Sequence, residues 1–286
     1  MKRLKQSIQE QRNRKEGNMS ESSFLVSLLA SGSSGNATYI ETPQRKILVD
    51  CGLTGKAISA QMEKIGRSVA DIDSILVTHE HVDHIKGIGV LARKYGMDIY
   101  ANEKTWKAME RKNIGVIKQE QKHLFEPGVT KTFGDIDVVS FSVSHDAASP
   151  QFYAFQKDQK QFVMLTDTGY VSEKLRKLLS NADAYLMESN HDIDMLRMGN
   201  YAWHLKQRIL SDKGHLSNED GALAMCEMLG DKTKRIYLGH LSQDNNLKEL
   251  AYQTAESILL QHDCGIHDTF EVYHTDPYEP TELFRV

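Results

Sequence analysis

The sequence predicts an α/β protein in which two mixed β-sheets pack face to face, with helices on the outside of each sheet. Two observations predict this arrangement. Short apolar runs that end in Gly, Ser or Asp alternate with segments that have the period of amphipathic helices. This course from strands to helices occurs twice, once in each half of the 286 residues. Two sheets that share a core bury the apolar face of each one.

The amino-terminal segment differs from the rest of the chain. Residues 1–20 are polar, lack a periodic apolar face and contain a second methionine, Met19. We expect a disordered or loosely helical basic tail here, and residues 1–18 precede the native start if translation begins at Met19. No Pro/Gly-rich linker follows, so residues 21–286 are expected to form one domain.

Within this domain each element is predicted from its pattern. Residues 31–35 form a Ser/Gly turn, and the segments that read as strands are 24–30, 37–42, 46–49, 74–77, 136–143, 152–156, 162–165, 184–187 and 235–238. Helical periodicity is found in 56–65, 84–95, 173–179, 201–210, 222–229 and 247–260. The helix predicted at 84–95 contains Gly87 and Gly89.

Composition excludes several classes of protein. Hydrophobic and charged residues make up 40% and 26% of the chain, as in ordinary globular proteins, and no stretch approaches the length of a membrane helix. The net charge is −4; residues 1–20 hold six basic and two acidic groups, so the rest carries 29 basic against 37 acidic. This is not the basic footprint of a general nucleic-acid binder. Three scattered cysteines and no signal peptide indicate a reducing cytoplasm.

The strongest motif is residues 79–84, His-Glu-His-Val-Asp-His, directly after the apolar strand 74–77. Imidazole and carboxylate are the ligands that first-row divalent metals take from proteins. One catalytic ion needs about three protein ligands, so the three imidazoles and the Asp83 carboxylate within six residues predict two neighbouring ions. His79 and His81, two apart on an extended segment, would face one ion, while Asp83 and His84 at the start of a helix would face the other.

Three further polar residues follow apolar strands. His145 comes after 136–143, Asp167 after 162–165 and His240 after 235–238. A lone residue at a strand end is ordinarily a surface or turn residue. Rigid strand ends that direct ligands into one cleft are nevertheless how a preorganised metal site is built, so we expect these three to join the first cluster.

The order His-x-His-x-Asp-His, then His, Asp and His, each after a strand, resembles the metallo-β-lactamase superfamily. The resemblance covers residues 24 to about 275 and implies a four-layer αβ/βα sandwich with its site at one edge between the sheets. It implies a first metal on His79, His81 and His145, a second on Asp83, His84 and His240, and Asp167 as the bridge. Asp50 would accept a hydrogen bond from a ligand imidazole, or else cap a strand. The two divalent ions would be Zn²⁺ or Mn²⁺, with Fe as a further option, because all ligands are imidazole or carboxylate.

Residues 213–220 narrow the chemistry. Ser217 and Asp220 form an acidic variant of a capping box, with His215 just before it. Gly-His-Leu-Ser resembles the Gly-His-Ser/Thr motif of the phosphodiesterase branches of the superfamily, in which the histidine meets the scissile phosphate. The resemblance therefore implies a metal-dependent phosphodiester hydrolase that uses a hydroxide shared by two ions, with Asp83 and His215 as catalytic residues. The alternative is a half-exposed histidine at a helix start.

Residues 188–192 also follow an apolar strand. Together with the Ser/Gly turn and the Gly-His-Leu-Ser-Asn run, they resemble the bacterial YycJ/WalJ subgroup, which is associated with 5′→3′ DNA exonuclease activity. Only 72 residues separate Asp167 from His240, too few for the lid of the β-CASP nucleases. Nucleic acid, with DNA favoured, is thus the expected partner; no membrane is expected, and the oligomeric state is open. The expected substrate-binding residues are Ser33, Ser34, Asn190, His191 and Ser217.

Residues 201–208 are the one segment with aromatic and basic side chains interleaved. Aromatic rings there would stack on bases while Lys206, Arg208 and Lys213 face phosphates. The alternative is an amphipathic helix whose aromatic residues belong to the core.

Other functions are compatible with parts of this pattern. The same ligands would serve an RNA nuclease or a hydrolase of thioesters, lactones or cyclic phosphates, and the Gly-His-Leu-Ser motif is the argument against the small-molecule hydrolase. A non-enzymatic metal protein would have a closed ligand set. A di-iron redox protein would carry a carboxylate at position 81, which is His81 here.

Overall fold

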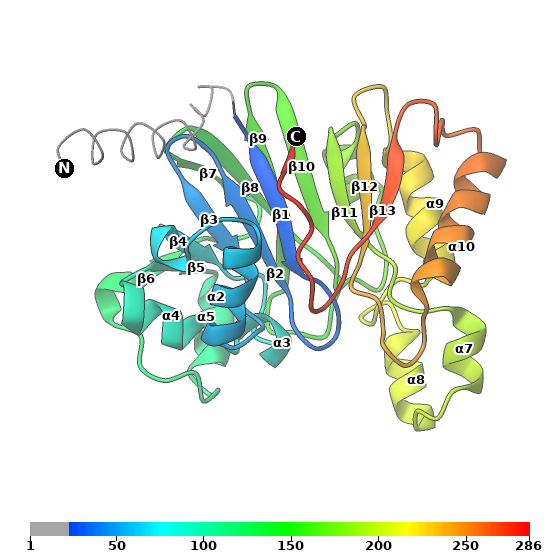
Figure 1. The fold of residues 1–286 in the computed structure, drawn as a ribbon. Helices are drawn as coiled ribbons and strands as arrows, with labels where there is room; N and C mark the ends of the chain where they lie inside the picture. Colours follow the sequence, from blue (N-terminus) through cyan, green and yellow to red (C-terminus); the bar gives the residue numbers. More distant parts are fainter. Residues whose placement is uncertain (1–22) are drawn as a thin grey trace, which may run out of the picture.

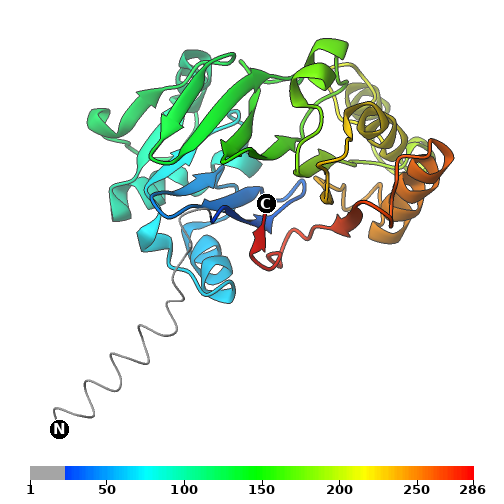
Figure 2. The ribbon, with the colours of Figure 1, turned by 90° about the horizontal axis from the view of Figure 1, so that it is seen from above.

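The computed structural model describes residues 23–286. The expectations for residues 1–20 and for a start at Met19 lie outside these described residues. Two seven-stranded sheets form the centre, and helices cover the outer face of each sheet (Figures 1 and 2). The predicted fold class is therefore confirmed.

The first sheet has the order β14-β1-β2-β3-β4-β5-β6. Its strands are β1 (Leu25–Ala30), β2 (Ala37–Glu41), β3 (Lys46–Val49), β4 (Ser74–Leu76), β5 (Asp98–Ala101), β6 (Lys122–Leu124) and β14 (Phe284–Arg285). Pairing is antiparallel from β14 to β3 and parallel from β3 to β6. β3 and β4 therefore end at the same edge of the sheet.

The second sheet has the order β13-β12-β11-β10-β9-β8-β7. Its strands are β7 (Thr130–Phe133), β8 (Ile136–Ser142), β9 (Gln151–Lys157), β10 (Lys160–Leu165), β11 (Ala184–Glu188), β12 (Arg235–Gly239) and β13 (Glu271–His274). Pairing is antiparallel from β7 to β10 and parallel from β10 to β13. The carboxyl ends of β10, β11 and β12 thus lie side by side.

Helices lie on the outside of both sheets. They are α2 (Gly55–Lys64), α3 (Val82–Ile85), α4 (Ile88–Tyr95), α5 (Glu103–Met109), α6 (Glu173–Leu179), α7 (Ile193–Met198), α8 (Trp203–Ile209), α9 (Asn218–Met228) and α10 (Lys248–Gln261). Two 3₁₀ turns span Val69–Asp71 and Gln119–Gln121. In Figure 1, α2, α4 and α5 flank the first sheet, and α9 and α10 flank the second.

Alternating side chains of the strands supply two cores. In β3, Ile47 and Val49 belong to the core between the sheets, whereas Leu48 packs in the core beneath the outer helices with Ile58 and Leu91. These three β3 residues are 0% exposed. A strand that is buried on both faces reads as a continuous apolar run, which is why the period-2 pattern is weak in this part of the sequence.

The prediction of a single helix over residues 84–95 is wrong. The structure has two helices, α3 and α4, and Gly87 is the N-cap of α4. A Cβ on Gly87 would lie 2.4 Å from both Cys51 Sγ and Leu53 O, and its amide donates to Cys51 O at 2.8 Å. The helix is interrupted because its backbone must approach residues 51–53 closely. The helix predicted at 222–229 begins earlier, at Asn218, because Ser217 caps it.

Candidate metal centre and active site

The histidine-rich turn begins where β4 reaches the carboxyl edge of the first sheet. His81 has extended backbone angles and is the N-cap of α3, so His79 and His81 lie on non-helical chain while Asp83 and His84 lie on the helix. The turn is fixed from behind: Cys51 N donates to His84 O at 2.7 Å, and a Cβ on Gly52 would lie 1.6 Å from Asp83 O. This close packing sets the position of all four polar side chains.

The second sheet brings its polar residues to the same place. Asp167 follows β10 and His240 follows β12, and each has a positive φ, 51° and 57°. Asp50, after β3, has a φ of 60°. Non-glycine residues rarely adopt this conformation, and such strain persists at functional sites where the surrounding structure enforces it. Here the left-handed residue lets the chain turn at once as it leaves each buried strand.

The seven candidate ligands form overlapping groups whose ligand atoms all lie within 4.8 Å of one another. The three groups made only of these ligands are His79 with His81 and His145, Asp83 with His84 and His240, and His79 with His84 and Asp167. The first two groups have the composition implied for two ions. Asp167 lies close to members of both: its Oδ1 is 3.8 Å from His145 Nε2 and 3.4 Å from His240 Nε2.

Unpaired atoms in this cluster test whether a metal fits. His79 Nε2, Asp167 Oδ2 and His240 Nε2 are buried and have no hydrogen-bond partner among the described residues. An unsatisfied buried polar atom costs about 1–3 kcal/mol. Two neighbouring divalent cations would satisfy all three, because imidazole and carboxylate are the ordinary ligands of such ions. The residues present therefore fit a metal site.

Hydrogen bonds behind the cluster orient the imidazoles. Asp50 Oδ2 lies 2.7 Å from His84 Nδ1, as expected of this aspartate, and Gly214 O lies 3.0 Å from His145 Nδ1. A carbonyl or carboxylate on one ring nitrogen leaves the other free to bind a metal. In both rings the nitrogen that faces the cluster is Nε2.

The charge of the cluster favours a cation. Burial lowers the pKa of His84, but the neighbouring carboxylates of Asp167, Asp50 and Asp83 raise it to about 9. Burial raises the pKa of Asp83, but His84 and His240 hold that pKa below its usual range. These carboxylates thus stabilise positive charge at the His84 side of the cluster.

Glu188 is the site residue for which we assigned no specific role from the sequence. It ends β11, between the strands that lead to Asp167 and His240, and is 0% exposed. Its Oε1 lies 2.8 Å from His215 Nδ1 and 3.0 Å from His240 Nδ1. Burial raises the pKa of Glu188, but the two histidines lower it below its usual range. The signal was present: one acidic residue ends an otherwise apolar strand.

His215 lies at the edge of the cluster and lines the cleft that opens over it. Its ring centroid is 4.9 Å from that of His145 and 5.1 Å from that of His240. Because Glu188 holds the Nδ1 of His215, the Nε2 of His215 is available on the side of the cleft. The segment after it begins α9, where Ser217 accepts a hydrogen bond from Asp220 N at 3.0 Å.

The expected substrate-binding residues fall into two sets. Ser33 and Asn190 line the cleft. Asn190 also donates to His240 O at 2.9 Å. Ser34 is exposed outside the cleft, whereas His191 and Ser217 are each 1% exposed. Burial lowers the pKa of His191 to about 4, so this ring is neutral at physiological pH.

Two expectations for residues 201–208 need correction. Trp203 is 65% exposed, so this ring is not part of the core. Lys206 is only 8% exposed, and its ammonium donates to Arg197 O and Gly199 O, both at 2.7 Å, which leaves it unavailable to phosphates. Carbonyls at the end of α7 attract the ammonium because they lack intrahelical partners. Arg208 and Lys213 are exposed.

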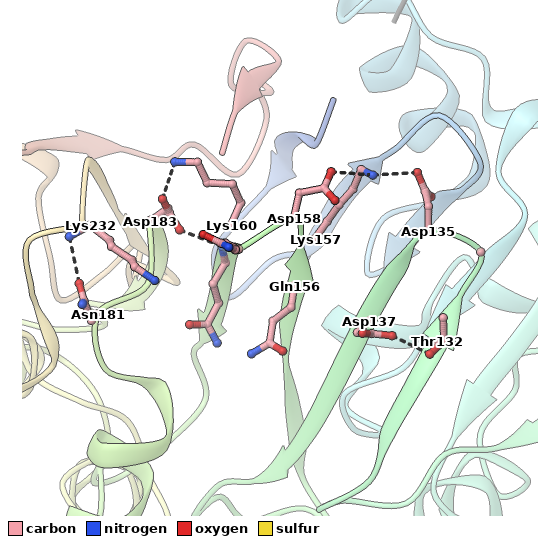
Figure 3. A pocket seen from close by; sticks show the side chains of 13 residues that line it. Thr132, Asp135, Asp137, Gln156, Lys157, Asp158, Lys160, Asn181, Asp183 and Lys232 are labelled. Atoms are coloured by element: carbon pink, nitrogen blue, oxygen red, sulfur yellow. Dashed lines mark hydrogen bonds and ion pairs between the residues drawn. The ribbon is translucent and has the colours of Figure 1, made fainter. Parts of the chain in front are cut away.

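A second hollow lies at the opposite ends of the strands of the second sheet, and Figure 3 shows its side chains. It is larger than the cleft, about 580 Å³ against about 220 Å³. Its carboxylates are partnered: Asp183 by Lys160 at 2.6 Å, and Asp135 by Lys157 at 3.2 Å. Nothing in it resembles the unsatisfied cluster of the cleft.

The two-sheet fold and the imidazole–carboxylate cluster define the class of metal-dependent hydrolases built on a β-lactamase sandwich. Residues 45–241 match the model of the β-lactamase superfamily domain, and the chain belongs to this family. The fold implies divalent metal ions. No helix in the described part of the chain is both long and apolar enough to span a membrane.

Relatives cover nearly the whole chain. It is 61% identical over 269 residues to exodeoxyribonuclease WalJ of Streptococcus pneumoniae, covering 94% of this chain and 100% of that protein. It is 54% identical over 257 residues to exodeoxyribonuclease YycJ of Bacillus anthracis, covering 90% and 97%. The metallo-β-lactamase fold protein YhfI of Bacillus subtilis superposes with a TM-score of 0.68 at 17% identity, covering 91% and 99%.

Proposed function

We propose that this protein is a DNA exonuclease that hydrolyses phosphodiester bonds with two divalent ions, Zn²⁺ or Mn²⁺, in the 5′→3′ direction. The observation that carries the proposal is the Glu188–His215 pair beside the seven-ligand cluster. A metal site alone suits many hydrolyses, whereas a carboxylate-held imidazole at its edge suits one in which a poor leaving group needs a proton. The names of the two relatives above support DNA as the polymer. The three cysteines are free, which fits a reducing cytoplasm.

Ions bound by the cluster would supply Lewis-acid activation of the phosphate and of a water molecule. His79, His81 and His145 would hold one ion, Asp83, His84 and His240 the other, and Asp167 both. The Asp83 carboxylate is 26% exposed and lines the cleft, where it can orient the attacking water and accept its proton.

His215 serves the leaving group. Its Nδ1 lies 2.8 Å from Glu188 Oε1, and this contact fixes the orientation of the ring. The Nε2 proton is then directed at the departing oxygen of the substrate, 3′ or 5′ according to which bond breaks. Glu188 also holds His240 Nδ1, so one buried carboxylate aligns a proton donor and a metal ligand.

Substitution of His215 tests the proposal. Metal-loaded His215→Ala is expected to retain its metal content but to lose roughly 10²–10⁴-fold in kcat on end-labelled DNA, as for loss of a general acid. His204→Ala is the matched control, because His204 is exposed on α8 and does not line the cleft.

The substrate panel should hold 5′- and 3′-labelled DNA, the same sequences as RNA, and a hydroxyacyl thioester. Early release of the 5′ label as a mononucleotide supports the proposed direction. If RNA or the thioester is turned over faster than DNA, that compound replaces DNA as the proposed substrate. Cleavage by His215→Ala at the parental rate would remove this histidine from the mechanism.

A further inference from the structure

An arm that comprises α7 and α8 projects beyond the carboxyl ends of β11 and β12 (Figure 1). The face of α8 toward the cleft presents Leu205, Arg208 and Ile209, and Tyr201 lies just before the helix. These residues form one wall of the cleft, which the candidate metal ligands His81, Asp83, His145, Asp167 and His240 also line. The chemistry proposed above uses none of them.

The arm is held firmly in place. Lys206 ties α8 to the end of α7 through its bonds to two carbonyls, each 2.7 Å long. Tyr201 OH donates to Asp244 Oδ2 at 2.7 Å, which joins the arm to the loop after β12. At its base, Asp192 N donates to Asn245 O at 2.9 Å. A wall fixed at both ends can position a ligand without the entropic cost of ordering a loop.

The wall carries the cation of the cleft. Arg208 is the one lysine or arginine among the described residues that line it, and the aspartates there are Asp83, Asp146 and Asp167. The Nε of Arg208 pairs with Asp146, while its side chain is 53% exposed. The Nη groups donate to no other described residue. A guanidinium fixed at Nε still presents two donors in the planar geometry that matches phosphate oxygens.

The size and surface of the cleft limit what lies against this wall. Its volume is about 220 Å³, below the roughly 300–1,000 Å³ of typical small-molecule pockets. A duplex does not fit into a cleft of this size, so a polymer would have to enter it as a single strand. Leu205, Ile209 and the ring of Tyr201 offer apolar surface to a base and no pattern of donors and acceptors that would distinguish one base from another.

We infer that α8 forms a nucleotide-binding subsite in which Arg208 binds the backbone phosphate next to the scissile one and the apolar wall supports one unpaired base. The subsite rests on the proposed exonuclease function. It explains how a chain with a net charge of −4 holds a polyanion: the cation lies inside the cleft. Asp146 acts as a positioning residue, because it holds the guanidinium at the mouth.

Arg208→Ala tests the subsite on a 5′-labelled oligonucleotide with the metal-loaded protein. We expect KM to rise about tenfold while kcat changes less than threefold, because Arg208 binds substrate away from the reacting atoms. The slope of log KM against log salt should shrink by about 1, as for the loss of one phosphate contact. Arg208→Lys should recover the salt slope but only part of the affinity, because an ammonium is not a bidentate donor.

The matched control is Arg197→Ala, which removes the same charge from the same arm at an exposed position outside the cleft. It should keep the parental KM and salt slope. Metal content is measured for each variant, because Asp146 Oδ1 is only 3.4 Å from His145 Nε2 and removal of Arg208 frees it. An Arg208→Ala protein with full metal content and parental KM and slope overturns the subsite.

Hydrolysis of bis-p-nitrophenyl phosphate by the parent separates the two proposals. This diester has no second backbone phosphate, so it reports on the metal centre without the subsite. If the parent cleaves it but not the oligonucleotide, the exonuclease function fails. If the parent cleaves both and Arg208→Ala raises the two KM values equally, only the subsite fails.

Discussion

Polar hollows of opposite character lie at the two ends of the strands of the second sheet. At the carboxyl ends of β10, β11 and β12, the cleft holds buried atoms without partners, such as Asp167 Oδ2 and His240 Nε2. At the other end, near the start of β10, Asp183 accepts from Lys160 Nζ at 2.6 Å and from Gln161 N at 2.9 Å (Figure 3). The larger hollow is thus the satisfied one.

This difference shows that polarity and size do not identify a functional site. Lysines pair with Asp135, Asp158 and Asp183 of the hollow, and the Thr132 hydroxyl donates to Asp137, so these carboxylates are satisfied within the fold. The carboxylates of the cleft face imidazoles that are themselves directed inward, and the group is complete only with a cation. A buried aspartate is therefore expected to act differently at the two ends.

Matched substitution of these two aspartates gives the largest expected contrast. Asp167→Ala should lower exonuclease activity roughly 10³-fold or more, because it removes the ligand proposed to bridge two ions. Asp183→Ala should leave kcat/KM within about twofold but lower the free energy of unfolding by about 2 kcal/mol, because Gln161 N loses its acceptor. Nuclease assays and urea denaturation measure the two effects. Comparable losses of activity in both variants would contradict the distinction.

Removal of the metal sharpens the same comparison. A chelator should lower the Tm of the parent by roughly 5–10 °C, because ions that bind only the folded state stabilise it by mass action. Asp183→Ala should show the same decrease, whereas Asp167→Ala should show much less. Thermal melts with and without chelator, with metal content from elemental analysis, check this. An unchanged parental Tm in a protein shown to have lost metal would argue against a metal-stabilised cleft.

Glu188→Gln addresses the support of the cleft and has a smaller expected effect. Activity should fall about 10–100-fold, as is usual when the partner of a ligand imidazole is altered, because an amide nitrogen replaces one of two oxygens that each have two hydrogen-bond partners. The control is Glu41→Gln: Glu41 ends β2, is 2% exposed and pairs with Arg67, far from the ligands in the sequence. It should lose stability but keep kcat. Equal losses of kcat in both variants would make Glu188 a purely structural residue.

The clustering of the candidate ligands could be predicted because each of them lies next to a strand that is recognisable from the sequence. His145, Asp167 and His240 follow apolar runs, and parallel strands such as β10 and β12 end at one edge. Which carboxylate accepts from which imidazole depends on pairing between strands far apart in the chain. Glu188 reaches His240 only because β11 lies beside β12, an adjacency that no local pattern contains.

The errors have the same origin. Gly87 was compatible with a helix by local propensity, and the segment around Cys51 interrupts that helix by contact from 36 residues away. The charge of Lys206 and its place in a segment of aromatic and basic residues predict a phosphate contact. In the fold, two carbonyls at the end of α7 take its ammonium, and the exposed cation in the cleft is Arg208 instead. Tertiary contacts decide which of several charged residues stays available.

Lys160→Ala has the smallest expected effect and sets the baseline for the hollow. The lysine side chain is 49% exposed, so its pair with Asp183 should contribute only about 0.5–1 kcal/mol to the free energy of unfolding, and less at high salt. Gln161 N still satisfies one oxygen of Asp183, so the loss should be well below that of Asp183→Ala. Denaturation at low and high salt measures it, with exonuclease activity at the parental value. A threefold or larger loss of activity would mean that the hollow, although its charges are paired, takes part in the function.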